Sequence, residues 1–146
     1  MWIAYAMTAS LFWGISYTVS EQLMKKISVA GVLLTSAVGC FLFALTVGLT
    51  TGVFVKDLEV VKKADGTAKM LMASVLVYVI ANTFILLATK SKNATMAAMV
   101  EITYPLFTAL FAYLIFKELQ VNAGVLAGAA LVLTGVGCIY YFGKNL

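Results

Sequence analysis

The chain has 146 residues and a net charge of +4; 63% of its residues are hydrophobic and only 11% are charged. Soluble domains average about 45–50% apolar and about 25% charged residues, so this composition excludes an ordinary soluble protein and indicates a single-domain integral membrane protein. The chain has no His, and its ten basic residues are all Lys, which removes the usual metal ligands and hydrolytic groups. We therefore expect no enzyme activity, no metal, no cofactor and no nucleic-acid partner.

Five apolar segments are long enough to cross a bilayer, since a membrane-spanning helix takes about 20 residues. The sequence predicts an all-α membrane domain over residues 1–146, with transmembrane helices at Trp2–Met24, Ile27–Val55, Met70–Thr89, Asn93–Phe116 and Val121–Phe142. Three of the four connections are short, so we expect consecutive helices to be antiparallel neighbours in a bundle.

The long connection, Lys56–Lys69, carries most of the charge outside the apolar segments. We predict a solvated loop with a turn at Asp65-Gly66. Its Leu58 and Val61 could instead lie on the lipid headgroups.

Polar residues form a stripe on the first predicted helix. Ser10, Gly14, Tyr17 and Glu21 fall on one face, with Trp13 beside them, because residues three and four apart lie together on a helix. Such a face needs protein or water next to it, so we expect it to line a cavity. Glu21, near the end, either lines this face or reaches the interface or Lys25.

The third predicted helix has one strongly polar pair near its middle, Asn82 and Thr83. Asn82 either contacts substrate or makes an interhelical hydrogen bond worth about 1 kcal/mol.

Glu101 is a lone carboxylate inside the fourth predicted helix, where a charge costs at least about 2.5 kcal/mol. Either a neighbouring hydroxyl, Thr103 or Tyr104, holds it as a protonated acid, or it lines a transport pathway; we favour the pathway. Pro105 cannot donate to the Glu101 carbonyl, so we predict a helix kink beside the acid.

The last predicted helix carries small residues that permit close helix packing. Gly124, Gly128 and Gly135 form either an intramolecular contact or a dimer seam, and we favour the seam slightly.

Lysines are balanced across the membrane. Five spans would place Lys56, Lys62, Lys63, Lys69 and Lys117 on one side and Lys25, Lys26, Lys90, Lys92 and Lys144 on the other. The positive-inside rule therefore selects neither orientation, which is the pattern of a chain that inserts both ways.

Together these features resemble a single EamA-type five-helix repeat of the drug/metabolite transporter superfamily. The resemblance is carried by Trp13-Gly14, the Ala-rich Asn93–Met99, Tyr104-Pro105-Leu106, Lys117-Glu118-Leu119 and the small-residue segment Gly128–Val136. It implies a transporter, usually built from two such units in inverted orientation around a central cavity, so we expect a second chain to supply the other unit.

A more distant similarity is to the small multidrug resistance proteins, antiparallel homodimers whose intramembrane acid lies in the first helix. Here the first helix has Gly14 in that region and the buried acid is Glu101, so we do not transfer the multidrug mechanism.

The resulting hypothesis is a secondary active transporter of a small organic solute, a metabolite or cationic compound. We expect proton coupling, because two nearby carboxylates in low dielectric disfavour simultaneous ionisation. We also expect an antiparallel homodimer of dual topology in a prokaryotic inner (cell) membrane. The predicted substrate- and proton-binding residues are Glu101, Trp13, Tyr17, Gly14, Ser10, Asn82 and Tyr104. The alternatives are half of a heterodimeric transporter, or a membrane assembly subunit without transport of its own.

Overall fold

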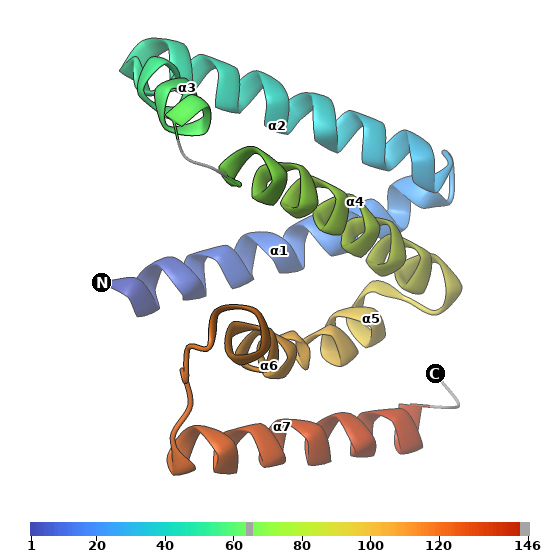
Figure 1. Ribbon diagram of the computed structural model, residues 1–146. Coiled ribbons are helices and arrows are strands. Elements are labelled where there is room, and N and C mark those ends of the chain that lie inside the picture. The colour runs from blue at the N-terminus through green and yellow to red at the C-terminus, as the bar shows by residue number, and fades with distance from the viewer. Residues whose placement is uncertain (64–65, 144–146) are drawn as a thin grey trace. The chain divides into compact units, whose positions relative to one another are not determined.

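The computed structural model describes residues 1–63 and 66–143, and no strand occurs among them (Figure 1). The described residues form α1 (Trp2–Met24), α2 (Val29–Thr51), α3 (Val53–Lys63), α4 (Thr67–Ser91), α5 (Ala94–Glu101), α6 (Tyr104–Phe116) and α7 (Ala123–Phe142). The all-α prediction is confirmed.

Among the described residues, four helical segments are long and apolar enough to cross a membrane: Val29–Thr51, Thr67–Ser91, Ala94–Phe116 and Ala123–Phe142. The protein is therefore an integral membrane protein. α1 has a comparable length of 23 residues, but its polar stripe makes it less apolar than the other four. Its crossing of the membrane, and with it the count of five spans, stays a prediction.

The chain divides into two compact units. The central unit is Ser20–Leu87, and the terminal unit combines Met1–Val19 with Ala88–Leu146. α1 and α4 each run from one unit into the other.

Asparagine and serine side chains cap the N-termini of three of the helices. Asn93 Oδ1 accepts a hydrogen bond from the Met96 N–H at 2.8 Å and so caps α5. Ser28 caps α2 and Asn122 caps α7 in the same way, and each cap satisfies an amide that the helix itself leaves unpaired.

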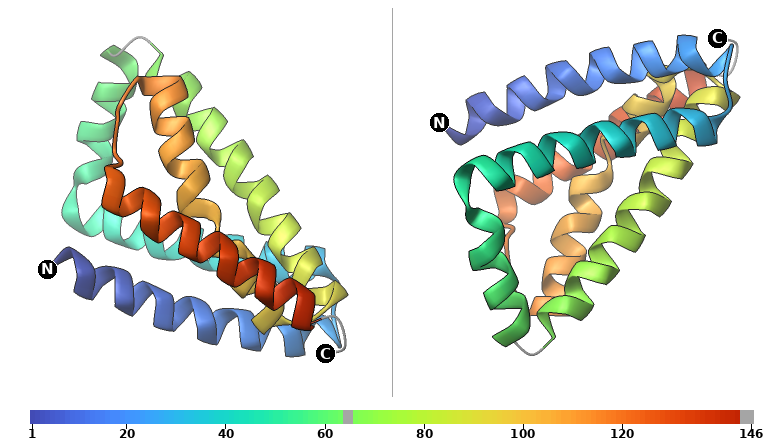
Figure 2. Two further views of the ribbon diagram at one scale, coloured as in Figure 1. Left: turned by 90° about the horizontal axis from the view of Figure 1, so that it is seen from below. Right: turned by 90° about the horizontal axis from the view of Figure 1, so that it is seen from above.

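α2 ends at Thr51, earlier than the predicted Val55, because Gly52 adopts a left-handed conformation with φ of 69°. Glycine does so without the steric penalty of a Cβ. The chain then turns sharply into α3 (Figure 2). The prediction of a solvated loop was therefore wrong for Lys56–Lys63, which is helical. Of the predicted turn, Gly66 has φ of 85°, and Asp65 lies outside the described residues.

Each unit has a small apolar core. In the central unit Met24, Val32 and Leu86 are buried together, with Val29 and Leu33 packed against them. In the terminal unit α5 packs against α7, and Ala94 and Ala97 are buried.

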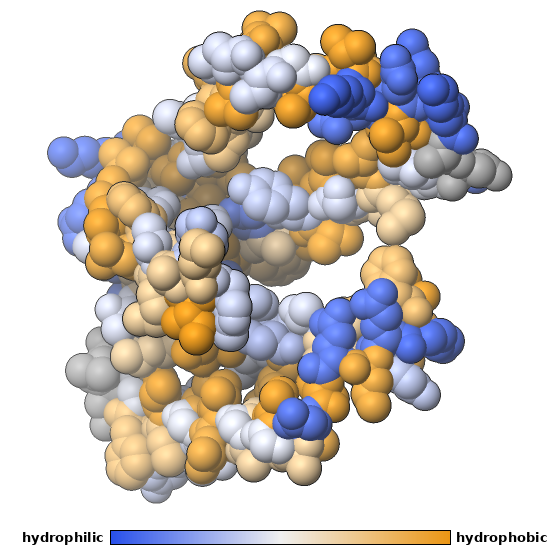
Figure 3. Space-filling view, turned by 90° about the vertical axis from the view of Figure 1, so that its left-hand side faces the viewer, coloured by the Kyte–Doolittle hydropathy of each residue, from blue (hydrophilic) through white to orange (hydrophobic). Residues whose placement is uncertain are grey.

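Many large hydrophobic side chains remain exposed, and much of the surface in Figure 3 is hydrophobic. A bilayer or a protein partner is the natural environment for such a surface, because large exposed apolar patches are rare on soluble monomers.

Candidate functional site

The segment predicted as one helix over Asn93–Phe116 is broken immediately after Glu101. α5 ends at Glu101, Ile102 and Thr103 form a turn, and α6 begins at Tyr104 with Pro105 in its first turn. Proline fits there because the first turn of a helix has unpaired amides anyway. The predicted kink is thus a two-residue turn whose backbone stays in the right-handed region, and it leaves the carboxylate at the end of α5.

Tyr17 is the hydrogen-bond partner of Glu101. Its phenol donates to Glu101 Oε2 over 2.6 Å, and both side chains are partly buried. The distance falls in the range of about 2.5–2.7 Å typical of hydroxyl donors to carboxylates. The two residues are 84 positions apart in the chain, so this bond connects α1 to the break between α5 and α6 within the terminal unit.

The two hydroxyls considered as partners from the sequence were Thr103 and Tyr104. Thr103 Oγ1 instead donates to the Val100 carbonyl at 3.0 Å. Tyr104 is 63% exposed. Glu101 is therefore held by a residue of another helix and not by its own turn.

An aromatic side chain extends the site along α1. The rings of Trp13 and Tyr17 lie with their centroids 5.4 Å apart and their planes tilted by 37°. Trp13 is 47% exposed, so a ligand can reach its face. Gly14, between them in sequence, leaves open space, because a Cβ placed there would meet nothing within 4 Å.

Within the described part of the chain, no lysine lies at ion-pair distance from Glu101. The carboxylate thus accepts a hydrogen bond from the phenol of Tyr17, whose ring lies beside that of Trp13. Chemically, this arrangement can accept a proton or a cation.

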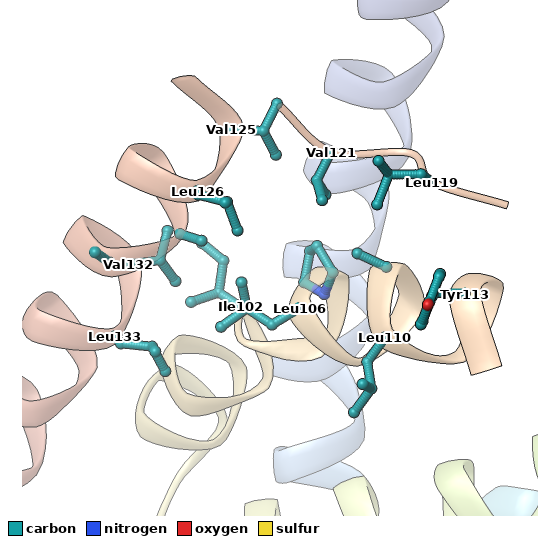
Figure 4. Close-up of a pocket in the computed structure, with 14 residues that line it drawn as sticks. Ile102, Leu106, Leu110, Tyr113, Leu119, Val121, Val125, Leu126, Val132 and Leu133 are labelled. Atoms are coloured by element: carbon teal, nitrogen blue, oxygen red, sulfur yellow. The ribbon is translucent and has the colours of Figure 1, made fainter. Parts of the chain in front are cut away.

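Sequence reasoning missed an apolar cavity of about 670 Å³ in the terminal unit. It lies between α6 and α7, and it begins at the helix break with Ile102 and Pro105 (Figure 4). Leu106, Leu110, Leu126 and Leu133 are among its walls. Its lining is almost entirely apolar, so no polar residue marks this cavity in the sequence. The one available sign is the segment between α6 and α7, whose Leu119 and Val121 are apolar and line the cavity.

The model of the EamA-like transporter family matches residues 1–141, nearly the whole chain. The chain belongs to the EamA-like transporter family. Membership indicates a membrane transporter and points away from an enzyme. Comparison with curated proteins and with solved structures gave no match.

Two other predicted site residues of this EamA-like chain donate hydrogen bonds within their own helices. Ser10 is exposed, and its hydroxyl donates to the Ala6 carbonyl at 3.0 Å. Asn82 belongs to the central unit and donates to the Tyr78 carbonyl at 2.9 Å. The structure thus brings together Trp13, Tyr17 and Glu101, and a binding role for each of the seven predicted residues stays a prediction.

Among the described residues, the glycine face of α7 has open space beside it. A Cβ placed on Gly128 or Gly135 would meet nothing within 4 Å there, and one on Gly124 would meet only Asn122 Oδ1, at 3.4 Å. Both the intramolecular contact and the dimer seam stay predictions.

Proposed function

We propose that this EamA-like protein is a secondary active transporter that binds a small organic cation at Glu101, against the rings of Trp13 and Tyr17. The observation that carries the proposal is the 2.6 Å hydrogen bond between Tyr17 and Glu101 at a broken membrane helix. Transporters characteristically place binding groups at such interrupted helices.

A cationic solute fits the chemistry of this group best. A carboxylate without a lysine partner attracts positive charge, and an exposed indole face adds about 0.5–2 kcal/mol of cation–π attraction. A zwitterionic metabolite with an ammonium group would meet the same requirements at its positive end.

Proton coupling follows from competition for one carboxylate. A proton on Glu101 removes the charge that holds the cation, so proton binding on one side of the membrane releases solute there. Entry of solute on the other side then requires loss of that proton. Between release of the proton and binding of the solute, the Tyr17 hydroxyl donates a hydrogen bond to the Glu101 carboxylate. Such a bond is stronger than one between neutral groups.

We further propose an antiparallel homodimer of dual topology in a prokaryotic inner membrane, with α1 as a fifth span. Two features support it: the equal lysine counts on the two sides of five spans, and the open face of Gly124, Gly128 and Gly135 on α7. In such a dimer, rocking of one subunit against the other exposes the site alternately.

The deciding experiment measures uptake in proteoliposomes. Vesicles containing the purified chain receive a radiolabelled quaternary ammonium probe, such as tetraethylammonium, and a labelled primary amine, each with and without a pH gradient. We expect saturable, gradient-dependent uptake that Glu101→Gln abolishes. Glu118→Gln is the matched control, because Glu118 lies outside the helices and bonds to Gln120.

If Glu101→Gln transports as well as the parent with the same gradient dependence, the carboxylate has no coupling role. Uptake that appears only after a second, different half-size protein is added would favour the heterodimer. A chain that binds no probe and carries none with any partner would be the assembly subunit.

A further inference from the structure

The helix α3 is amphipathic. Phe54, Leu58 and Val61 recur at intervals of four and three and share one face, whereas Lys56, Glu59 and Lys63 share another. With 11 residues, it is too short to cross a bilayer.

Its first turn is fixed to the end of a membrane-spanning helix. Gly48 in the last turn of α2 is buried under the ring of Phe54, so closely that a Cβ at this position would collide with the ring. Gly52 then reverses the backbone direction with φ of 69°. Because α2 is apolar enough to span the membrane up to Thr51, α3 starts at the membrane boundary and departs from the axis of α2 (Figure 2).

The apolar face of α3 is partly open beyond this first contact. Leu58 is 57% exposed, whereas Val61 is partly buried. A short helix with one apolar and one charged face, starting at the end of a span, matches the geometry of helices that lie in the headgroup layer.

The charged residues of α3 favour anionic headgroups. Lysines outnumber acids on α3, with Lys56, Lys62 and Lys63 against Asp57 and Glu59. Glu59 is engaged by Lys63 at 3.5 Å. A hollow of about 430 Å³ is lined by Lys56, Glu59, Val60 and Lys63, large enough for a phosphate group beside the Lys56 ammonium.

We propose that α3 is an interfacial helix that binds the headgroup phosphates of anionic phospholipids. Lys56 and Lys63 flank the hollow described above, in which a headgroup phosphate would bind. Lys62 lies at the border of the apolar face and extends its ammonium from the acyl region toward the phosphates. Phe54, Leu58 and Val61 enter the upper acyl region. The inference does not depend on the transport function.

The first test measures lipid preference. The full chain in phosphatidylcholine vesicles receives trace spin-labelled phosphatidylglycerol or phosphatidylcholine, and electron paramagnetic resonance reports the lipid immobilised on the protein. The test variant is Lys56→Gln/Lys62→Gln/Lys63→Gln. The matched control, Lys26→Gln/Lys90→Gln/Lys92→Gln, removes the same number of charges elsewhere: Lys26 and Lys92 lie between helices and Lys90 lies in the last turn of α4.

At low salt we expect the parent and the control to prefer phosphatidylglycerol, and the α3 variant to lose at least about fivefold of that preference, the effect of one lysine near an anionic surface. Equal loss in the control, or no preference in the parent, overturns the proposal. Loss of the preference on adding soluble glycerophosphoglycerol also overturns it, since the site would then bind free phosphate esters.

The second test measures depth. Spin labels on Leu58→Cys and on Glu59→Cys, each in a Cys40→Ala/Cys138→Ala background, are compared for collisions with oxygen and with an aqueous nickel chelate. We expect the label at position 58 to meet oxygen and the label at 59 to meet nickel. Equal access of nickel to both positions overturns the interfacial placement, and circular dichroism confirms that both variants keep their helical content.

Discussion

The Tyr17–Glu101 hydrogen bond predicts a measurable coupling energy between two helices. A double-mutant cycle with Tyr17→Phe and Glu101→Met removes the donor, the acceptor and both. Hydrogen bonds to charged groups contribute about 1.5–3 kcal/mol, whereas interhelical bonds in membrane proteins average about 0.6 kcal/mol. The O–O distance of 2.6 Å argues for the charged class. Because both side chains are only partly buried, we expect the lower end of that range, about 1.5 kcal/mol.

The assay is the free energy of unfolding in lipid bicelles, measured by steric trapping for the parent, the two single variants and the double variant. The coupling should fall toward about 0.6 kcal/mol on acidification, because a protonated carboxyl makes the bond neutral. Tyr5→Phe with Glu101→Met is the control cycle, since Tyr5 is exposed on the same helix; distant pairs usually couple by less than about 0.5 kcal/mol. A Tyr17 cycle no larger than the Tyr5 cycle would refute the bond.

Three further predictions concern the aromatic wall, the α2–α3 contact and the dimer seam. Trp13→Ala should weaken binding of a quaternary ammonium probe by about 2- to 30-fold, the equivalent of one cation–π contact; equilibrium dialysis checks this, and unchanged affinity removes the indole from the site. Gly48→Ala should lower the free energy of unfolding by about 1 kcal/mol or more, because the new methyl group displaces the Phe54 ring. Gly39→Ala is the control: a Cβ there meets nothing within 4 Å, so the same unfolding assay should show no change or a stabilisation. Gly128→Leu should reduce cross-linked dimer in membranes, whereas Ala129→Leu, which points into the α6–α7 cavity, should leave it intact; equal dimer yields would exclude the glycine seam.

Sequence reasoning succeeded where one local rule decides the outcome. Apolar length predicts the four apolar helices of spanning length, because a bilayer requires about 20 residues. The interruption before Tyr104 follows from the missing N–H of Pro105.

It failed where a competing local signal was stronger or where the contact is distant. The charged residues and the Asp65-Gly66 pair outweighed the helical spacing of Phe54, Leu58 and Val61, so Lys56–Lys63 of α3 was predicted as part of a loop. Membership of Tyr17 and Glu101 in one site was predicted from polarity alone. That the phenol, and not Thr103, is the partner depends on how α1 packs in the terminal unit, and nothing in the local sequence encodes this.

The helix break at Glu101 also constrains the surroundings of the site without reference to any substrate. Glu101 lies about 10 Å of helix rise from Ala94, inside the segment Ala94–Phe116 that is apolar enough to span the membrane. Irregular backbone at such a depth persists only where protein covers it or water reaches it, because lipid offers no hydrogen-bond partners. Tyr17 supplies protein on one side, and the polar stripe of α1 needs the same kind of neighbour. We therefore expect α1 and the α5–α6 turn to face a shared polar space, because a carboxylate can exchange protons or cations only where water or polar protein groups reach it.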